Sequence, residues 1–259
     1  MVTGPGGTLI RSELRDGVRL VTLDKPEVLN AFNQDQFELM AERMLEAQDD
    51  PETRVVVLTG AGRAFSAGAD LSGTPLQRSS YRYGFKGLVD VVIDFPKPFI
   101  CAVNGLGVGW GATVVGLADA AFMAESARLR CPFSTLGLTA EGASTYTFPR
   151  IMGPQAAARF LLGAEWWPAQ ECKSDRLALD VYPDEGFLER VMEYATALAK
   201  LPLASLLETK GLLVGPHREA MHRANEAENE GLRRLSGGPA NLEAVAAFRE
   251  KRPADFSKV

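Results

Sequence analysis

Short strand-like runs alternate with helix-like stretches through the first half of this 259-residue chain, and this alternation restricts its fold more than any other feature. Apolar and β-branched runs occupy residues 8–14, 18–23, 54–59, 99–103 and 121–124. Helical periodicity occupies residues 34–45, 85–93 and 112–118. Because strands separated by helices usually lie parallel in one sheet that the helices cover, we predict an α/β core with a mostly parallel sheet.

Two local patterns sharpen this prediction near the N-terminus. Asp16 and Gly17 separate the first two strand-like runs, and an Asp-Gly pair is typical of a tight turn between antiparallel strands. Asn33 is followed three residues later by Gln36, a spacing that favours the start of a helix. We therefore expect an N-terminal hairpin followed by a helix.

Beyond Glu141 the pattern of the chain is almost entirely helical. Helical periodicity covers residues 155–162, 186–200, 203–214, 218–235 and 241–250. Only residues 177–182 indicate a further strand. We therefore assign residues 1–195 to the α/β core with the site, and residues 196–259 to a C-terminal helical oligomerisation region.

The oligomerisation assignment depends on apolar positions in that C-terminal region. They exceed what a two-layer core needs, and large exposed apolar patches usually mark interfaces. The alternative is that they pack only within one subunit. The positions are Leu203, Leu206, Leu207, Leu212, Leu213, Val214, Ala244, Val245, Ala247 and Phe248.

The charge balance argues against two classes of partner. The chain has 28 Lys and Arg against 33 Asp and Glu, for a net charge of −5 at pH 7. Binding to nucleic acid or to an anionic membrane needs clustered positive charge. No apolar run approaches the roughly 18 residues of a membrane-spanning helix. We expect no nucleic-acid partner and no membrane association.

The cysteines and the chain ends bear on compartment and metals. Cys101, Cys131 and Cys172 form no Cys-x-x-Cys pair, and only two histidines are present. This argues against a disulfide framework and a metal site, and favours a reducing compartment. The first residues lack the features of a secretory signal, and the last three do not match the peroxisomal tripeptide Ser-Lys-Leu. We expect a cytoplasmic protein.

Three stretches could carry chemistry, and each also has a purely structural interpretation. Residues 63–71 follow a buried strand and have small side chains, so a ligand could approach the backbone; a tight connection capped by Asp70 is the alternative. Residues 104–111 place glycine at every second position before a helix, whose free N–H groups could bind an anion. Close packing of that helix on a sheet explains the same glycines.

The third stretch, 136–145, contains one carboxylate among small and apolar residues. Glu141 lies near an expected helix start, where a glutamate commonly complements the helix dipole. If Glu141 instead faces an apolar cleft, desolvation would raise its pKa and make it a usable base. The residues alone favour the first interpretation.

In their order and spacing these stretches resemble the crotonase (enoyl-CoA hydratase/isomerase) superfamily, over nearly the whole chain. The resemblance is carried by residues 18–31, 55–71, 95–105, 132–152 and 248–253. It implies an α/β fold with a crotonase-like ββα spiral core and a helical C-terminal extension. The chain departs from the family at one position: Arg176 stands where the family usually has glycine. If the backbone there is left-handed, a residue other than glycine costs about 1 kcal/mol of stability.

The resemblance assigns roles to three residues of the reaction centre. The two backbone N–H groups that bind the thioester oxygen correspond to Ala67 and to Trp110, where relatives carry glycine. The two glutamates of hydratases fall at Thr113 and Phe133, and neither side chain can act as a carboxylate base. The single glutamate of the Δ3-Δ2-enoyl-CoA isomerase branch corresponds to Glu141.

The resemblance also implies where substrate binds. The implied contacts are Val28, Leu29, Asn30, Ala67, Gly68, Ala69, Asp70, Leu71, Trp110, Phe133, Phe248 and Lys251. Phe248 and Lys251 would lie near the site of a neighbouring subunit, in a homotrimer or a dimer of trimers. No metal and no redox cofactor is implied, because coenzyme A enters as part of the acyl-CoA substrate.

We therefore expect an enzyme that moves a 3-enoyl-CoA double bond to the 2-position, with Glu141 transferring the proton through an enolate. Two alternatives remain. One is a hydratase, or another reaction of the family, with an unfamiliar acid–base pair drawn from Asp70, Thr113 and Glu141. The other is an acyl-CoA-binding protein without catalytic activity.

Overall fold

The computed structural model describes residues 9–70 and 81–259. The N-terminal hairpin is confirmed: β1 (Ile10–Arg15) pairs antiparallel with β2 (Val18–Leu23), with Arg15 opposite Val18. Asp16 and Gly17 form the turn with φ values of 49° and 80°. Gly17 adopts this left-handed backbone without steric cost, which explains why the turn falls there.

The parallel sheet predicted from the alternating pattern is also present. It adds β3 (Val55–Gly60), β5 (Phe99–Val103), β7 (Ala120–Ala124) and β10 (Asp180–Tyr182) to the hairpin, in the order β1-β2-β3-β5-β7-β10. All neighbouring pairs except β1–β2 are parallel. β3 and β5 are completely buried or nearly so, as expected of parallel strands covered on both faces.

A second sheet runs beside the first and consists of four short strands. These are β4 (Ala64–Ser66), β6 (Leu106–Val108), β8 (Arg128–Arg130) and β9 (Trp166–Pro168), in the order β4-β6-β8-β9. Along the chain, β3, β5 and β7 enter the large sheet, and each next strand enters the small one in the same order. This repeated progression is the expected ββα spiral.

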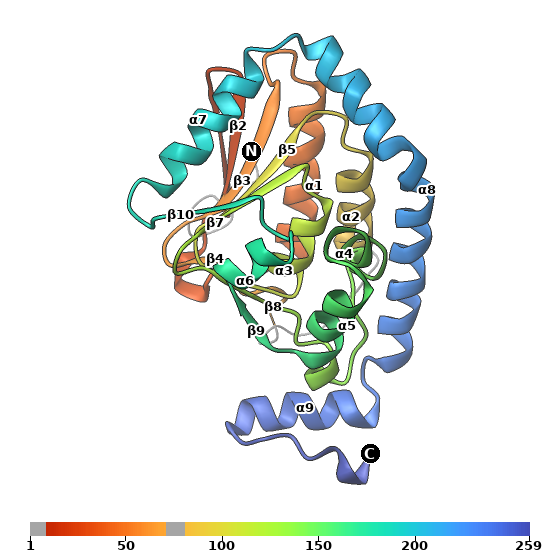
Figure 1. The fold of residues 1–259 in the computed structure, drawn as a ribbon. Helices are drawn as coiled ribbons and strands as arrows, with labels where there is room; N and C mark the ends of the chain where they lie inside the picture. The colour runs from red at the N-terminus through yellow and green to blue at the C-terminus, as the bar shows by residue number, and fades with distance from the viewer. Residues whose placement is uncertain (1–8, 71–80) are drawn as a thin grey trace.

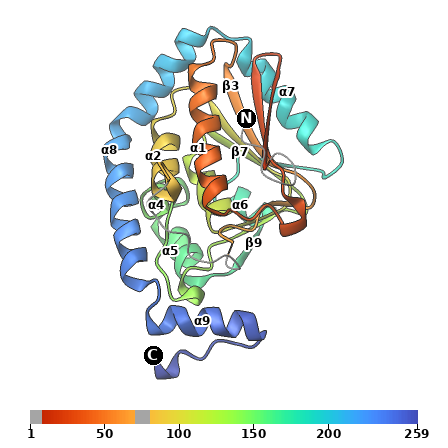
Figure 2. The ribbon, with the colours of Figure 1, turned by 180° about the vertical axis from the view of Figure 1, so that it is seen from behind.

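Helices cover the large sheet on both sides (Figures 1 and 2). On one side lie α1 (Gln34–Asp49) and α2 (Gly84–Asp94), and on the other α7 (Phe187–Ala199). The start of α1 has the anticipated capping box: Asn33 Oδ1 accepts from the Gln36 N–H at 2.9 Å, and Gln36 Oε1 accepts from the Asn33 N–H at 3.1 Å.

The remaining helices lie around the small sheet and along the molecule's edge. They are α3 (Trp110–Thr113), α4 (Ser144–Met152), α5 (Pro154–Gly163), α6 (Ala169–Ser174), α8 (Leu203–Leu235) and α9 (Pro239–Glu250). Short 3-10 turns also occur: η1 (Pro26–Val28), η2 (Val114–Leu117), η3 (Ser134–Leu136) and η4 (Phe256–Lys258). η2 continues α3, so the single helix expected over 112–118 is split in two.

The two helices expected at 203–214 and 218–235 are one continuous helix, α8, with Pro216 inside it. Figure 1 shows α8 curving along one side of the body, and α9 lying beyond the end of the body. Side chains before and after the proline hold α8 in place. Lys210 Nζ donates to Asp119 Oδ2 at 2.7 Å, and His222 contacts Asp90 on α2 at 2.9 Å. These contacts support α8 on both sides of Pro216, although a proline inside a helix usually kinks or ends it.

Arg176 has a φ of 66°, so the backbone there is in the region that favours glycine. This agrees with the departure noted from the sequence. Within residues 9–70 and 81–259, no helix combines the length and the apolar content needed to cross a bilayer.

Candidate active site

The carboxyl ends of three parallel strands bring together the stretches singled out in the sequence. β4 pairs parallel with β6, and β6 with β8, so these strands end at one edge of the small sheet. β4 leads to residues 67–70, β6 leads to the start of α3, and β8 leads toward the segment that contains Glu141. Ligands commonly bind where parallel strands end.

The first two of these connections touch each other. A Cβ placed on Gly68 would lie 2.5 Å from the Val108 carbonyl oxygen, and one on Gly109 would lie 3.9 Å from Gly68 Cα. Gly68 has a φ of 79° and Gly109 a φ of 55°. The glycines therefore allow both the turns and the close approach of the two backbones.

The N–H group of Ala67 is not the free donor that the sequence predicted. It donates to the Leu29 carbonyl at 2.8 Å, so it is already engaged inside the protein. Two residues further on, Ala69 forms a parallel bridge with Phe32, in which Phe32 N–H binds Gly68 O and Asp70 N–H binds Phe32 O. In this pattern the Ala69 N–H points away from Phe32, and it finds no acceptor among the described residues. On this loop, the N–H group left without a described acceptor is therefore that of Ala69, not that of Ala67.

Trp110 carries a second N–H group without a helical acceptor. It is the first residue of α3, where a helical N–H has no acceptor within its own helix. Gly109 before it donates to Arg130 O at 3.0 Å, which fixes the start of α3 to β8. Since Gly68 and Gly109 are in contact, the N–H groups of Ala69 and Trp110 belong to adjacent backbone segments.

Glu141 lies in the loop before α4 and is buried, with 6% of its surface exposed. The Thr113 hydroxyl donates to Glu141 Oε1 at 3.0 Å. The other oxygen, Oε2, is buried and has no partner within the described chain. A Cβ on Gly142 would lie 2.6 Å from Thr113 Oγ1 and 3.6 Å from Trp110 Cε3, so the loop packs directly on α3.

The surroundings of Glu141 shift the pKa of its carboxyl upward. Burial raises its pKa to about 8; the hydrogen bond from Thr113 opposes this rise, and the nearby carboxyl of Glu228 adds to it. An ionised carboxylate is costly in such a site, so the charged form is a strong proton acceptor. The interpretation of Glu141 as a base required a buried environment that raises its pKa, and the structure has this environment.

Glu228 of α8 holds the loop that carries Glu141. Its carboxyl accepts from the Ala143 N–H at 2.7 Å, the Thr145 N–H at 2.9 Å and the Thr145 hydroxyl at 2.6 Å. It therefore caps the start of α4 from another helix, where Ala143 has a φ of 57° and no capping side chain of its own. Burial raises the pKa of Glu228, and these hydrogen bonds oppose the rise.

Aromatic side chains form one wall beside α3. Trp110 is 3% exposed, and its ring packs edge-on against Phe85 of α2 at a centroid distance of 5.6 Å. Phe85 in turn packs on Phe37 at 5.2 Å. The indole of Trp110 thus fills space between α2 and α3, while its backbone N–H stays available.

The other predicted contacts on the first loops have different environments. Val28 is exposed, and Leu29 and Asn30 both have a φ of 56°. Asn30 is fully buried, and its side chain donates to Ala61 O at 3.0 Å and Ala64 O at 2.8 Å. It also accepts from the Lys25 N–H at 2.9 Å. Its side chain therefore holds the loop rather than facing a ligand.

Asp70 is partly exposed at the end of the described loop, and Leu71 lies outside the described residues. Phe133 is buried and lines a pocket of about 450 Å³, together with Ala140, the residue before Glu141. Phe248 is 65% exposed on α9, and Lys251 is exposed at the end of that helix. Their contact with a neighbouring subunit's site stays a prediction.

The free N–H group of Ala69 and the presence of Glu228 at this site were not anticipated from the sequence. Ala69 was grouped with the substrate contacts, and only the hydrogen-bond pattern of the loop distinguishes it from Ala67. Glu228 had a detectable pattern: Met221, Asn225 and Glu228 follow a helical spacing, and all three are buried in α8. A charged residue on the buried face of a helix predicts a buried partner.

The protein therefore has an α/β fold in which strands of the small sheet end beside a buried carboxylate and two N–H groups without acceptors in the described part of the chain. A family model described as enoyl-CoA hydratase/isomerase matches residues 13–258, and the chain belongs to this family.

Several relatives and solved structures share this similarity. Human enoyl-CoA delta isomerase 2 is 34% identical over 87% of this chain and 59% of its own length, and the Rattus norvegicus protein of that name is 33% identical over 95% and 64%. The chain thus spans about three fifths of these two relatives. The 1,2-epoxyphenylacetyl-CoA isomerase of Escherichia coli is 32% identical over 96% of this chain and 98% of its own. A crystal structure of an enoyl-CoA hydratase/isomerase from Pseudoalteromonas atlantica superposes with a TM-score of 0.92 at 27% identity, covering 96% and 100% of the two chains.

Proposed function

We propose that this chain is a Δ3-Δ2-enoyl-CoA isomerase, which moves the double bond of a 3-enoyl-CoA into conjugation with the thioester. The observation that carries the proposal is the buried carboxylate of Glu141, which has one unpartnered oxygen beside α3. The similarity to two proteins named enoyl-CoA delta isomerase 2 supports the same reaction.

The proposed reaction needs only Glu141 and two backbone donors. Glu141 Oε2 removes a proton from C2, and the electron pair of that C–H bond moves toward the thioester oxygen. The N–H groups of Ala69 and Trp110 bind the resulting enolate oxygen, and each such donor typically lowers the barrier by ~3–4 kcal/mol. Glu141 then returns a proton at C4, and the double bond lies between C2 and C3.

One base can serve both carbons because they are separated by a single carbon on the same side of a planar dienolate. Thr113 binds Oε1 of Glu141, so the hydrogen bond leaves Oε2 as the oxygen that faces the substrate. The apolar pocket of about 450 Å³ next to Ala140 offers room for the alkyl tail. The substrate contacts predicted at Val28, Asp70 and Leu71 stay part of this proposal.

Hydration is the main competing reaction. It needs a carboxylate that activates water and a second group that protonates the substrate, and the positions usual in the family hold Thr113 and Phe133. Phe133 is apolar and buried, and the Thr113 hydroxyl is engaged with Glu141. We therefore expect negligible hydratase activity.

Two substrates separate the reactions in one experiment. The purified protein is given either a 3-enoyl-CoA or the corresponding 2-enoyl-CoA, and the products are resolved by chromatography and mass spectrometry. The proposal expects conversion of the 3-enoyl to the 2-enoyl compound and almost no 3-hydroxyacyl-CoA from either. Rapid formation of 3-hydroxyacyl-CoA would favour the hydratase, and binding without any conversion would favour the non-catalytic alternative.

A further inference from the structure

Three buried oxygen atoms without partners, termed the oxygen row, belong to residues at or just before the start of α4. They are Glu141 Oε2, Ser144 Oγ and Thr147 Oγ1. Among the described residues only six buried side-chain nitrogen or oxygen atoms lack a partner, so half of them fall within seven residues. Buried polar groups are nearly always hydrogen-bonded, and such a cluster calls for an explanation.

The spacing of the three residues suits bridging by water. Ser144 and Thr147 are three residues apart in α4, so they share a face with Cβ atoms about 5–6 Å apart. The Ser144 N–H binds Glu141 O at 3.3 Å across a tight turn in which Gly142 and Ala143 have φ values of 73° and 57°. The three oxygens make no direct hydrogen bond to one another, and a water placed between two polar groups can bridge them.

Gly116 of η2 packs closely against the Thr147 hydroxyl. A Cβ on Gly116 would lie 2.7 Å from Thr147 Oγ1 and 2.7 Å from Phe148 Cε1. Any larger residue at 116 would therefore clash with this part of α4. Ser144 is fully buried and Thr147 is 6% exposed, so the two hydroxyls are otherwise enclosed by protein.

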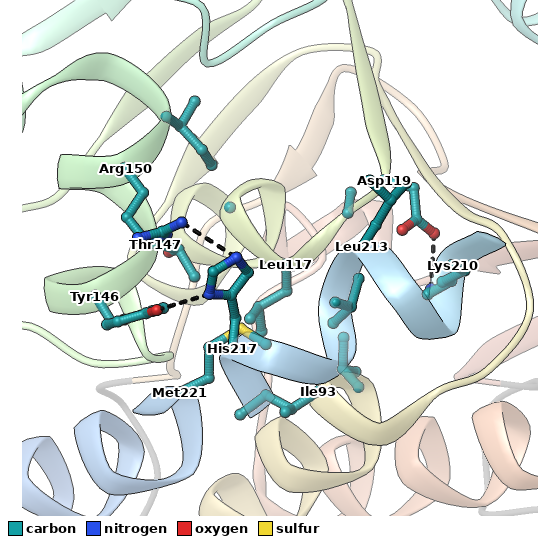
Figure 3. A pocket seen from close by; sticks show the side chains of 15 residues that line it. Ile93, Leu117, Asp119, Tyr146, Thr147, Arg150, Lys210, Leu213, His217 and Met221 are labelled. Atoms are coloured by element: carbon teal, nitrogen blue, oxygen red, sulfur yellow. Dashed lines mark hydrogen bonds and ion pairs between the residues drawn. The ribbon is translucent and has the colours of Figure 1, made fainter. Parts of the chain in front are cut away.

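The Thr147 end of this row meets a pocket of about 160 Å³ between α4 and α8 (Figure 3). Arg150 Nη2 donates to His217 Nε2 at 3.1 Å, so the ring proton is on Nδ1. Nδ1 then donates to the Tyr146 hydroxyl at 3.0 Å, which leaves the Tyr146 proton free. The exposed side chains of Arg150 and Leu213 line the same pocket, so solvent reaches it.

We propose that Ser144 and Thr147, with water between them, conduct protons between Glu141 and the pocket at His217. This inference rests on the proposed isomerase reaction. While Glu141 carries the proton taken from C2, the row lets that proton leave toward the pocket and a solvent proton replace it. Only O–H bonds break and form, and one proton enters for each that leaves. The path gives hydrogen-bonding partners to three enclosed oxygens, one on the base and one on a residue that lines the solvent-facing pocket.

The test is an isomerisation run in D₂O, with the deuterium at C4 of the 2-enoyl-CoA product measured by mass spectrometry. The wild-type enzyme is expected to place deuterium at C4 in a large share of product molecules. In Thr147→Val, which keeps the shape but removes the hydroxyl, that share falls by about threefold or more. Product still forms, because Glu141 can carry the same proton from C2 to C4.

Matched variants distinguish the path from a structural effect. Ser144→Ala should lower the deuterium share as Thr147→Val does, whereas Thr147→Ser retains the hydroxyl and the exchange. Thr135→Val removes a hydroxyl that binds Pro132 O outside this row, and it should match the wild type. Wild-type product without deuterium at C4 would overturn the proton path, as would an unchanged share in both Ser144→Ala and Thr147→Val. Absence of any 2-enoyl-CoA product from the wild type would instead overturn the proposed isomerase function.

Discussion

At the scale of single residues, Glu141 is subject to influences that act in opposite directions. Burial and the Glu228 carboxyl favour its neutral form, while the Thr113 hydroxyl favours its charged form. The outcome is a pKa of about 8, so that at neutral pH most free enzyme carries a protonated Glu141. The reactive base is therefore a minority form whose amount depends on pH and on Thr113.

This balance predicts the pH dependence of the reaction. Because the ionised form is the base, kcat/KM should rise with pH and be half-maximal near the Glu141 pKa of about 8. It should level off only at pH values well above this midpoint. In Thr113→Val the hydrogen bond to the charged form is lost, so the midpoint should move upward. Thr113→Ser retains a hydroxyl and should keep the midpoint near that of the wild type. Profiles from pH 6 to 10 give these midpoints, and a downward move in Thr113→Val would contradict the assignment.

The sequence could identify Glu141 but not its complete surroundings. A glutamate among small residues is compatible with either a helix cap or a base, and only its burial against α3 decides between them. Sequence patterns could not show whether Ala67 or Ala69 has the free N–H group, because every residue type except proline has a backbone N–H. It depends on which loop residue bridges to Phe32, which is a feature of tertiary structure.

At the scale of helices and strands, α2 and α8 are joined by a histidine between two carboxylates. His222 Nδ1 lies 2.9 Å from Asp90 Oδ1, and Nε2 lies 3.1 Å from Asp94 Oδ1. Partial burial disfavours the charged ring, but the hydrogen bonds to Asp90 and Asp94 outweigh this and raise the pKa of His222. Because α2 carries Phe85, which packs on Trp110, this contact helps to fix one wall of the site.

The sign of this shift determines when the contact stabilises the fold. A folded-state pKa above the unfolded value near 6.5 means that the contribution is complete below that pH and is lost as pH rises through the folded pKa. We expect His222→Gln to lower the free energy of unfolding by under about 1 kcal/mol at pH 5.5, since His222 is a third exposed. The difference should shrink toward pH 9. Urea titrations of both proteins at the two pH values test this, and a difference that grows with pH would refute it.

The ends of helices and strands could be predicted where neighbouring residues alone determine a turn or a helix cap. The Asp16-Gly17 turn and the Asn33–Gln36 box place the hairpin and α1 correctly, because both act through neighbouring residues. Pro216 led to a prediction of two helices where the structure has one. Lys210 and His222, on either side of the proline, bind residues outside α8 and hold the helix in place. The four strands of the small sheet have three residues each, too few to show an alternating pattern.

At the scale of the whole molecule, large apolar side chains remain exposed around α5 and α9. Leu162 is 73% exposed, Leu242 59% and Phe248 65%. Part of the C-terminal apolar set does pack within the subunit, since Ala244 and Ala247 are buried where α9 meets η3. Exposed apolar side chains of this size usually bind another protein surface, and those around α5 and α9 constitute the candidate surface.

We predict that this surface is covered in a homotrimer or a dimer of trimers, as the family resemblance implies. Light scattering at micromolar concentration should then give a mass of about 84 kDa, or twice that, from chains of 28.0 kDa each. Leu162→Lys is the matched variant, because a charge on this exposed side chain weakens an apolar contact between subunits without disturbing the core. Its measured mass should therefore be lower than that of the wild type. A wild-type species of 28.0 kDa would rule out the trimer.

The central claim is that Glu141 transfers the proton, and Glu141→Gln tests it most directly. The amide keeps the shape of the side chain but cannot accept a proton, so kcat for 3-enoyl-CoA isomerisation should fall by at least about 100-fold. Binding of the acyl-CoA, measured by calorimetry, should stay close to that of the wild type, and Glu208→Gln on the exposed face of α8 should retain full activity. Full isomerase activity in a correctly folded Glu141→Gln variant would contradict the account.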